Sequence, residues 1–290
     1  MRYIPRITGD WKLLFRPEKF GRYVNDHCLI RDRWRHWHLF GITSLEEGPD
    51  TERYFVHASN GDESLLTPMT ELNKVIDDGV RAWAPCVVEH EGLYYMYYGP
   101  GVTRMAVTNE LYHWMGHEIH VTGNPVMSVN RDHMVLRVGD RWLMYASGLR
   151  NGYSCISLLT STDLVNWEFS GYALTSSGNA PLNPPWGALE SPYVLEYRGM
   201  YYLFVTYTDC SYENYQNTLV FCSPDPCFFG DYTGDNGGQM VLATLRSHAG
   251  EVIRDGDSYY ITCAGWRGFD IPCEGGVAIA ELTFEPEEGR

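Results

Sequence analysis

The sequence has few basic residues and no long hydrophobic run. Among its 290 residues, 22 lysines and arginines face 37 acidic residues, which gives a formal net charge of −15. Such an acidic chain repels phosphate backbones, so we do not expect a nucleic-acid binder. No apolar stretch approaches the roughly 18 residues of a membrane-spanning helix, and the N-terminus lacks the apolar core of a secretory signal. With Met1 as the native start, we expect a cytoplasmic protein that binds no membrane.

Paired cysteines of the kind that bind zinc are also absent. None of the eight cysteines belongs to a CxxC motif or to a Cys/His spacing typical of zinc sites. Most of them lie in apolar, strand-like runs, where a free thiol behaves as a small hydrophobic group. We therefore expect reduced structural thiols, and neither a metal nor a cofactor.

Helical periodicity is nearly absent, and a repeated pattern of strands takes its place. The turn glycines Gly92, Gly139, Gly199 and Gly256 follow one another at steps of 47, 60 and 57 residues. Each of these glycines lies in a hairpin turn between an apolar strand and an aromatic-rich strand. A fifth segment, the first in the chain, has the same pattern with an Asp-Arg turn. These segments are Asp26–Ile42, Trp83–Gly99, Asp132–Gly148, Glu190–Thr206 and His248–Gly265.

A radial array of small antiparallel sheets fits this repeat, because it leaves only short, protected sheet edges. The sequence therefore predicts an all-β fold, a single five-bladed β-propeller over residues 1–290, with blades that begin near residues 26, 83, 132, 190 and 248. The limited helical pattern of Thr70–Asp78 is interpreted as a loop. We expect Gly276–Phe284 to complete the last blade or to close the ring with the N-terminal segment.

The first residues of each repeat carry the chemistry, because the innermost strand of a propeller blade begins near the central axis. Three of the five repeats begin with an acidic residue, namely Asp26, Asp132 and Glu190. Acids at the buried start of an apolar strand are costly unless they are paired or functional. Either they pair with Arg131 and neighbouring histidines, or they form a site. Glycoside hydrolysis needs two such groups, a proton donor at the leaving oxygen and a carboxylate at the anomeric carbon.

The three acids also differ in register. Measured against the apolar pairs that follow them, Glu190 lies one position earlier in its strand than Asp26 and Asp132. Such an offset is a plausible source of the asymmetry between a proton donor and a nucleophile.

The acidic blocks resemble those of the five-bladed propeller glycosidases, glycoside hydrolase family 32 and its relative family 43. Family 32 has Asn-Asp-Pro, Arg-Asp-Pro and Glu-Cys-Pro blocks, and this chain has Asn25-Asp26-His27, Arg131-Asp132-His133 and Glu190-Ser191-Pro192. The resemblance extends from about Asn25 to Leu282. It implies a fructosyl-type glycosidase with Asp26 as nucleophile, Glu190 as general acid/base and Asp132 as transition-state stabiliser.

The chain also departs from the family 32 pattern. His27 and His133 replace prolines, Ser191 replaces a cysteine, and the C-terminal β-sandwich of family 32 is not present in the sequence. Family 43, which inverts, uses a similar acidic set and often consists of the propeller alone. The Arg-Asp pair favours the retaining family 32 type. An inverting arabinofuranosidase or xylosidase and a non-catalytic sugar-binding propeller are the alternatives, and the uncovered flank permits a homo-oligomer.

Several further side chains are expected to bind the oligosaccharide or glycoside substrate. Trp83 and Trp186 offer rings that stack on a sugar face, or they pack in the core. His248 begins the fifth repeat, where family 43 enzymes often hold a histidine near an axial ion or water; the alternative is a hydrogen bond to a backbone carbonyl. Glu251 is a weaker candidate, and Trp266 and Arg267 are candidates for the rim. The predicted binding set is Asn25, His27, Trp83, Arg131, His133, Trp186 and His248.

Overall fold

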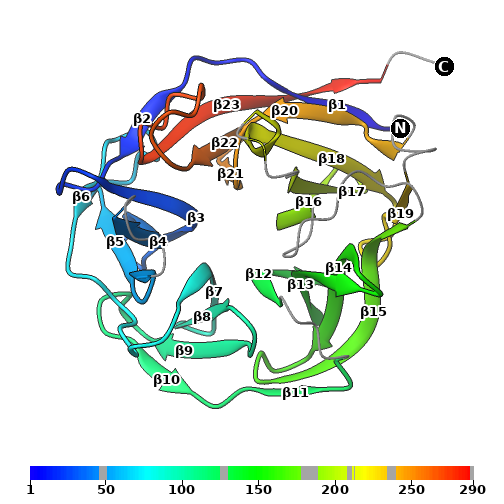
Figure 1. The fold of residues 1–290 in the computed structure, drawn as a ribbon, viewed down its shortest axis with the longest axis horizontal. Helices are drawn as coiled ribbons and strands as arrows, with labels where there is room; N and C mark the ends of the chain where they lie inside the picture. Colours follow the sequence, from blue (N-terminus) through cyan, green and yellow to red (C-terminus); the bar gives the residue numbers. More distant parts are fainter. Residues whose placement is uncertain are drawn as a thin grey trace.

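The computed structural model describes residues 1–45, 51–124, 130–177, 189–207, 211, 213–233 and 240–287. Its strands form five sheets that surround a common centre (Figure 1). The prediction of an all-β fold with five propeller blades is therefore confirmed. Among the described residues, no helix has the length and apolar character needed to cross a membrane.

The first two blades have four strands each. The first contains β3 (Arg22–Arg31), β4 (Trp37–Leu45), β5 (Phe55–Ser59) and β6 (Thr70–Glu71). The second contains β7 (Trp83–His90), β8 (Leu93–Gly99), β9 (Arg104–Thr108) and β10 (Met115–His117). The expected loop at 70–78 thus begins with a short edge strand.

The third blade has β12 (Arg131–Val138), β13 (Arg141–Arg150), β14 (Tyr153–Ser161) and β15 (Asn166–Ser177), and β11 (His120–Thr122) and β19 (Gly230–Thr233) pair in parallel with β15. The fourth has β16 (Leu189–Tyr197), β17 (Met200–Tyr207), β18 (Asn217–Ser223) and β20 (Ala243–Arg246).

The fifth blade joins the two ends of the chain. It contains β21 (Val252–Asp255), β22 (Ser258–Ala264) and β23 (Val277–Pro286), and the N-terminal strands β1 (Tyr3–Ile7) and β2 (Lys12–Phe15) both pair with β23. The last strand therefore completes the blade and also closes the ring with the N-terminal segment.

The hairpins follow from their turn residues. Glu91 and Gly92 have φ values of 51° and 80°, and Arg198 and Gly199 have values of 52° and 77°. Two successive positive φ angles define the type I′ turn, whose twist matches that of the flanking strands. These turns lie at the ends of the innermost strands β7 and β16, so they set the pairing register of the residues at the centre.

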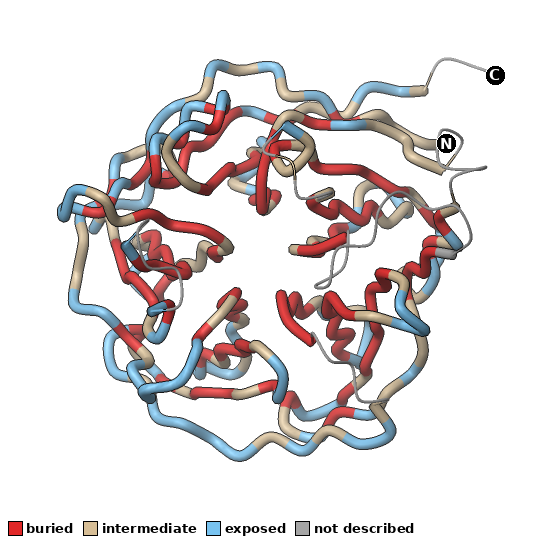
Figure 2. The backbone as a smooth tube through the Cα atoms, viewed as in Figure 1, coloured by how far each residue is buried: buried red, intermediate tan, exposed pale blue. Residues whose placement is uncertain are grey.

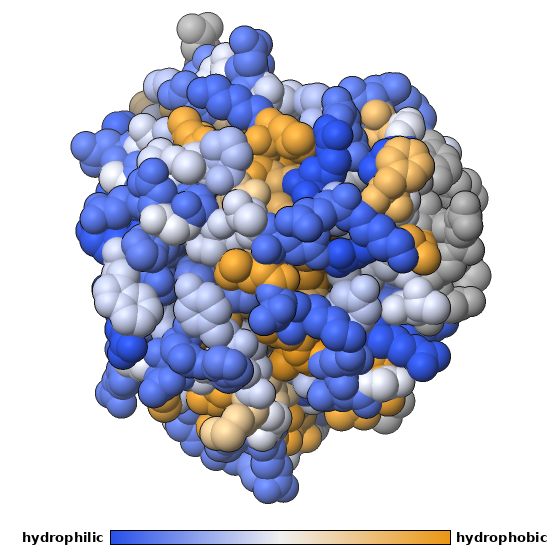
Figure 3. All heavy atoms as spheres, turned by 90° about the vertical axis from the view of Figure 1, so that its left-hand side faces the viewer, coloured by the Kyte–Doolittle hydropathy of each residue, from blue (hydrophilic) through white to orange (hydrophobic). Residues whose placement is uncertain are grey.

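The core lies between neighbouring blades. Tyr97 and Met105 of the second blade, for example, pack in one buried cluster with Val135, Met144 and Trp167 of the third. The inner strands are accordingly most buried in their first halves, near the centre (Figure 2). In the side view of Figure 3, hydrophilic side chains cover most of the visible surface. The described cysteines are free thiols, and Cys210 lies outside the described residues.

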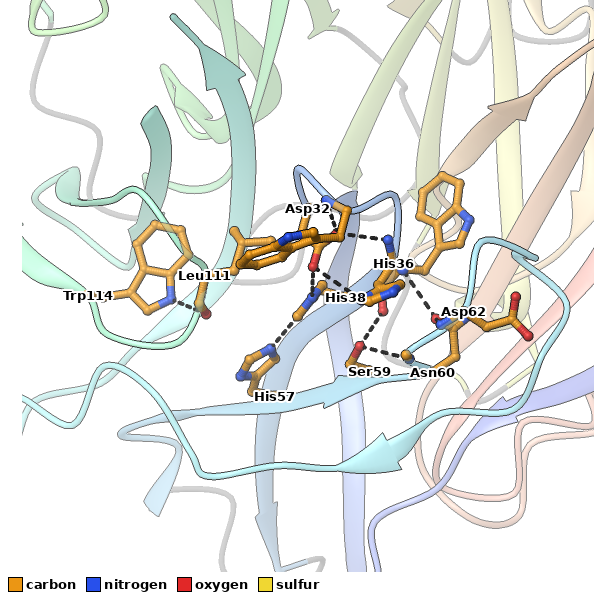
Figure 4. A network of polar contacts seen from close by, with 12 residues as sticks. Asp32, His36, His38, His57, Ser59, Asn60, Asp62, Leu111 and Trp114 are labelled. Carbon is orange, nitrogen blue, oxygen red and sulfur yellow. Dashed lines mark hydrogen bonds and ion pairs between the residues drawn. The ribbon is translucent and has the colours of Figure 1, made fainter. Parts of the chain in front are cut away.

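A tryptophan holds the outer turn of two blades in the same way. The indole nitrogen of Trp114 donates to the carbonyl of Leu111 at 3.1 Å (Figure 4), and that of Trp167 donates to Leu164 at 3.0 Å. Both leucines have positive φ, 68° and 66°. The repeated strand-turn-Trp element is therefore a structural device.

A polar network stabilises the β3–β4 turn (Figure 4). One carboxylate oxygen of Asp32 accepts hydrogen bonds from the backbone amides of Trp34 (2.9 Å) and His36 (2.8 Å). The other faces His38 at 3.4 Å, and Nδ1 of His38 lies 2.8 Å from Nε2 of His57. Since Asp32 follows the last residue of β3, this network lies at the hairpin end of the strand.

Candidate active site

The innermost strands of the blades share an irregularity where they face the centre. The pairing of β7 with β8 is interrupted between Trp83 and Cys86, and the same interruption occurs in β3, β12 and β16. Two residues of the inner strand are unpaired in each of these bulges. Ala84, Asp132, Ser191 and, in the fifth blade, Ala249 have φ between 47° and 56°. Non-glycine residues adopt this conformation at a cost of about 1–2 kcal/mol each, and bulges re-aim the side chains beside them.

The bulges change the register expected from the sequence. Glu190 is the last paired residue before its bulge, Asp132 is the first residue inside its bulge, and Asp26 is the second residue inside its own. The expectation that Glu190 precedes Asp132 by one position is confirmed. The expectation that the two aspartates are equivalent is wrong, because the apolar pairs used for the alignment do not reveal where an unpaired residue is inserted.

Residues from the bulges of four blades, together with the segment that precedes β21 in the fifth, line one small central cavity. Its volume is about 30 Å³, which is room for only one or two water molecules. Asp26 and Asp132 line the cavity directly. Glu190 does not line it but is linked to Asp132 through Arg131. The lining residues are Asp26, His27, Ala84, Pro85, Asp132, His133, Ser191, Pro192, Tyr193, Ala249, Gly250 and Glu251.

Two residues link the three acids. The hydroxyl of Ser191 donates a hydrogen bond to Asp26, and its backbone amide donates to Asp132 at 3.1 Å. The guanidinium of Arg131 lies 3.3 Å from the carboxylate of Asp132 and forms an ion pair with Glu190. The structure thus brings Asp26, Asp132, Glu190 and Arg131 together, as the sequence predicted.

The electrostatic environment differs among the carboxyl groups. Burial and the negative charges of Asp132 and Glu190 raise the pKa of Asp26 well above its usual value, and the hydrogen bond from Ser191 opposes this shift. Burial also raises the pKa of Asp132, against the opposing effect of Arg131. Burial raises the pKa of Glu251 to about 8, and the charge of Asp26 adds to the effect. A carboxyl cluster of this kind holds protons at pH values where isolated acids would lose them.

The three histidines predicted for the site are neutral hydrogen-bonding groups. Burial lowers the pKa of His27 and of His248 to about 4, and that of His133 to about 3. The ring of His27 lies 2.8 Å from the hydroxyl of Thr262, and that of His133 lies 2.9 Å from Thr103. Both histidines also line the central cavity.

His248 connects the fifth blade to the first. Its Nδ1 donates to the carbonyl of Tyr215 at 2.9 Å, and its Nε2 lies 2.6 Å from the side-chain oxygen of Asn25. The alternative expected for a satisfied buried histidine, a hydrogen bond to a backbone carbonyl, is therefore the one observed. Among the described residues, no group of three or more histidine, cysteine or acidic side chains is arranged to hold a metal ion.

Of the two tryptophans predicted to bind a sugar, the structure describes one, Trp83. Trp83 precedes its bulge at the same register position as Arg131 and Glu190, and the guanidinium of Arg81 lies 5.3 Å from its ring. Its indole N–H is buried and finds no hydrogen-bond partner among the described residues. Trp186 lies outside the described residues.

Tyr215 is a site residue that the sequence analysis did not identify. Burial and the charges of Glu190 and Asp26 raise the pKa of its phenol well above the usual value, which places the hydroxyl beside the acidic cluster. The centroid of its ring lies 4.2 Å from that of the His248 ring and 5.7 Å from that of Trp266, on which it stacks. Tyr215 belongs to the short 3₁₀ helix Asn214–Gln216, outside the repeats, so no repeat pattern pointed to it.

Comparison with known proteins agrees with the fold. No protein-family model matches the chain. A β-xylosidase/α-arabinofuranosidase of family 43 from a compost microbial metagenome is 14% identical, with a TM-score of 0.64, over 97% of this chain and 96% of its own. An exo-1,5-α-L-arabinanase from a bovine ruminal metagenomic library is 16% identical, with a TM-score of 0.60, over 90% of this chain and 92% of its own.

A family 32 enzyme has the same fold over part of its length. The β-fructofuranosidase of Bombyx mori is 16% identical, with a TM-score of 0.61, over 91% of this chain but only 61% of its own. The expected resemblance to the five-bladed propeller glycosidases is thus confirmed at the level of the fold.

Proposed function

We propose that the protein is a glycoside hydrolase whose active site lies at the centre of the propeller. The observation that carries the proposal is the junction of Asp26, Asp132 and Glu190 from three blades through Ser191 and Arg131. Glycoside hydrolysis needs at least two carboxyl groups with different roles, and an acid cluster of this kind is costly without a function. The fold shared with xylosidases, an arabinanase and a fructofuranosidase supports the same reaction class.

In the proposed mechanism, Asp26 attacks the anomeric carbon and Glu190 donates a proton to the leaving oxygen. Glu190 then accepts a proton from the water that hydrolyses the glycosyl-enzyme. Asp132 stabilises the positive charge that develops on the sugar ring. Glu190 must take up a proton before it can donate one to the leaving oxygen. Arg131 pairs with both Asp132 and Glu190, so its guanidinium keeps Asp132 as a carboxylate partner while Glu190 is protonated.

The substrate-binding groups surround these acids. Trp83 has a buried indole N–H without a partner among the described residues, and a sugar hydroxyl would satisfy it. His27 and His133, which line the cavity, supply further polar groups, and Tyr215 extends the set. His248 has both ring nitrogens engaged with Tyr215 and Asn25, so it positions Asn25. We propose a furanoside of fructosyl type as the substrate, because the Asn25-Asp26 and Arg131-Asp132 pairs match the family 32 blocks.

An inverting arabinofuranosidase or xylosidase is the second candidate. The observation that favours it is the fold shared with a β-xylosidase/α-arabinofuranosidase and an exo-1,5-α-L-arabinanase, with TM-scores of 0.64 and 0.60. A sugar-binding propeller without catalysis is the third. Its weakness is that a lectin needs no buried proton donor.

Release of sugar from a small substrate panel tests the proposal. The panel contains sucrose, short fructans, and nitrophenyl α-L-arabinofuranoside and β-D-xylopyranoside, and Asp26→Asn serves as the inactive control. Cleavage of one of these by the wild type, lost in the control, supports the proposal and selects the candidate. Sugar binding in calorimetry without any cleavage would instead identify a binding module.

A further inference from the structure

A fourth carboxyl group, that of Glu251, faces the centre from the fifth blade. Glu251 lies two residues beyond Ala249, the residue with positive φ, and it lines the same 30 Å³ cavity as Asp26 and Asp132. No lysine or arginine is among the residues that line this cavity. The mechanism proposed above assigns no role to Glu251, although it places a titratable group beside the nucleophile.

The surroundings of Glu251 offer no positive charge to balance a carboxylate. The groups that interact with it are Asp26 and the thiol of Cys28 from β3, the thiol of Cys86 from β7 and the phenol of Tyr193 from β16. Burial raises the pKa of both thiols and of the phenol, so all three are neutral at pH 7. The backbone amide of Leu29 lies 3.4 Å from its carboxyl oxygen, which is at the limit of a useful hydrogen bond.

The remaining neighbours do not change this balance. His27 and His133 line the same cavity, and burial keeps their pKa at about 4 and about 3, so both are uncharged at neutral pH. Within its own blade, Glu251 contacts the hydroxyl of Thr262, which accepts a hydrogen bond from the Glu251 backbone amide at 3.0 Å. An ionised Glu251 would therefore be a buried charge without compensation, which is strongly unfavourable.

Burial and the charges of Asp132 and Glu190, which Asp26 faces, raise its pKa and disfavour its ionised form. Asp26 also has a side-chain hydrogen-bond donor, which Glu251 lacks among the described residues. The hydroxyl of Ser191 donates a hydrogen bond to Asp26, and a hydrogen bond to the charged form favours that form. Two carboxyl groups that share a cavity do not both ionise readily, so the group with the better donor loses its proton first.

We propose that Glu251 and Ser191 together determine where the proton of the central cavity lies: Glu251 holds it, and Asp26 is the ionised nucleophile. Glu251 is then a positioning residue that acts through Asp26, and this assignment rests on the proposed glycosidase function. When Glu251 loses its proton to solvent at alkaline pH, the new charge repels the Asp26 carboxylate from the Ser191 hydroxyl, and activity falls.

Glu251→Gln tests this proposal, because glutamine has the shape of a protonated glutamic acid and does not ionise. As the pH rises, we expect kcat/KM of the wild type to fall with an apparent pKa near 8, the value of Glu251. The variant should keep its activity to a pH at least one unit higher. At pH 6 the variant should retain more than a tenth of the wild-type kcat/KM. Glu91→Gln is the matched control, since Glu91 is 83% exposed in a hairpin turn, and it should leave the alkaline limb in place.

Ser191→Ala tests the other half of the proposal. Loss of the hydroxyl removes a hydrogen bond to the Asp26 carboxylate, so we expect the apparent pKa of the acidic limb of the kcat/KM profile to rise by roughly one unit. The apparent pKa of the alkaline limb of the kcat/KM profile, which we assign to Glu251, should not change. An unchanged acidic limb in Ser191→Ala would overturn the assignment of the proton to Glu251 through Ser191.

Infrared difference spectroscopy gives a readout that needs no substrate. At pH 6 the wild type should show the carbonyl stretch of a protonated carboxyl group that Glu251→Gln lacks, and the band should disappear above pH 9. Identical wild-type and variant spectra, or a folded Glu251→Gln variant that has lost activity more than a hundredfold at pH 6, would overturn the proposal. If no glycoside is cleaved at all, the glycosidase function fails, and the infrared band still decides where the proton lies.

Discussion

Arg131 and Glu190 form an ion pair at the centre of the propeller, where their side chains are only 5% and 6% exposed. Both are the last paired residues before the bulge of their strands, so the same register position in two adjacent blades supplies opposite charges. Removing two charges from water costs several kcal/mol per ion, and a buried pair repays this only with good geometry. Such a pair is better explained by a function than by stability.

Removal of the guanidinium should strongly destabilise the fold. In Arg131→Met, the carboxylates of Glu190 and Asp132 stay buried without their cation, and breaking a buried pair in this way typically costs about 3–5 kcal/mol. The free energy of unfolding from urea titration measures the effect. Arg6→Met is the control: Arg6 and its partner Glu285 are 55% and 53% exposed, and an exposed pair contributes about 1 kcal/mol at most. Equal losses in the two variants would contradict the prediction.

Glu190→Gln should affect substrates according to their leaving groups. General acid catalysis contributes typically 10²–10⁴ in rate, and only a poor leaving group needs it. We therefore expect a loss of that order for an oligosaccharide and a much smaller loss in bond cleavage for a dinitrophenyl glycoside, whose phenolate departs without a proton. Stopped-flow measurement of phenolate release separates this step from later hydrolysis.

Asp26→Asn is the matched variant for that comparison, because no leaving group compensates for a missing nucleophile. It should abolish the cleavage of both substrates. If Glu190→Gln instead slowed bond cleavage equally for both, Glu190 would not be the proton donor, and Tyr215 and Glu251 would be the next groups to substitute.

The fold was predictable from the sequence because its signals are local. Asp-Gly, Glu-Gly and Arg-Gly turns between apolar runs specify hairpins within about 17 residues, and their repetition specifies the blades. Asp26, Asp132 and Glu190 followed from the same repetition, since each lies at the start of a blade. The bulges did not follow, because an unpaired residue leaves the apolar pattern on either side of it unchanged.

The parts of the site outside the repeats could not be predicted in this way. Tyr215 reaches the acidic cluster from a 3₁₀ helix between β17 and β18, and its position depends on how His248 and Trp266 pack against it. The role of Ser191 could not be predicted either, although Ser191 lies within a repeat. Its hydroxyl and backbone amide contact Asp26 and Asp132 of other blades. Contacts between blades depend on closure of the ring.

The stereochemistry of the reaction should distinguish the two glycosidase types. With Asp26 as nucleophile we expect retention of configuration, which requires carboxyl groups about 5–5.5 Å apart, whereas inversion requires about 6.5–9.5 Å. Proton NMR of the first sugar released, recorded before mutarotation, identifies the anomer. Release of the inverted anomer would make Asp26 a general base and would favour the arabinofuranosidase or xylosidase candidate.

Acid should destabilise the protein through its buried histidines. Burial lowers the pKa of His57 and of His133 to about 3, and that of His27 and of His248 to about 4, whereas an unfolded histidine titrates near 6.5. Below pH 6.5 these histidines bind protons in the unfolded chain but not in the folded chain, so their contribution to the free energy of unfolding falls as the pH falls towards 4. The buried carboxyl groups of Asp26, Asp132 and Glu251, whose pKa values are raised, act in the opposite direction.

The size of this effect per histidine is about 2 kcal/mol at pH 5, since each pH unit below 6.5 contributes about 1.4 kcal/mol. His133→Gln should therefore lose less stability than the wild type between pH 7 and pH 5, whatever its stability at pH 7. Urea titrations at pH 7, 6 and 5 measure the slopes. His117→Gln is the control, because His117 lies in the exposed strand β10, and the smaller loss expected of His133→Gln should be absent from it. The same slope in His133→Gln and the wild type would show that the ring of His133 is protonated in the folded state, which contradicts a neutral hydrogen-bonding role in the cavity.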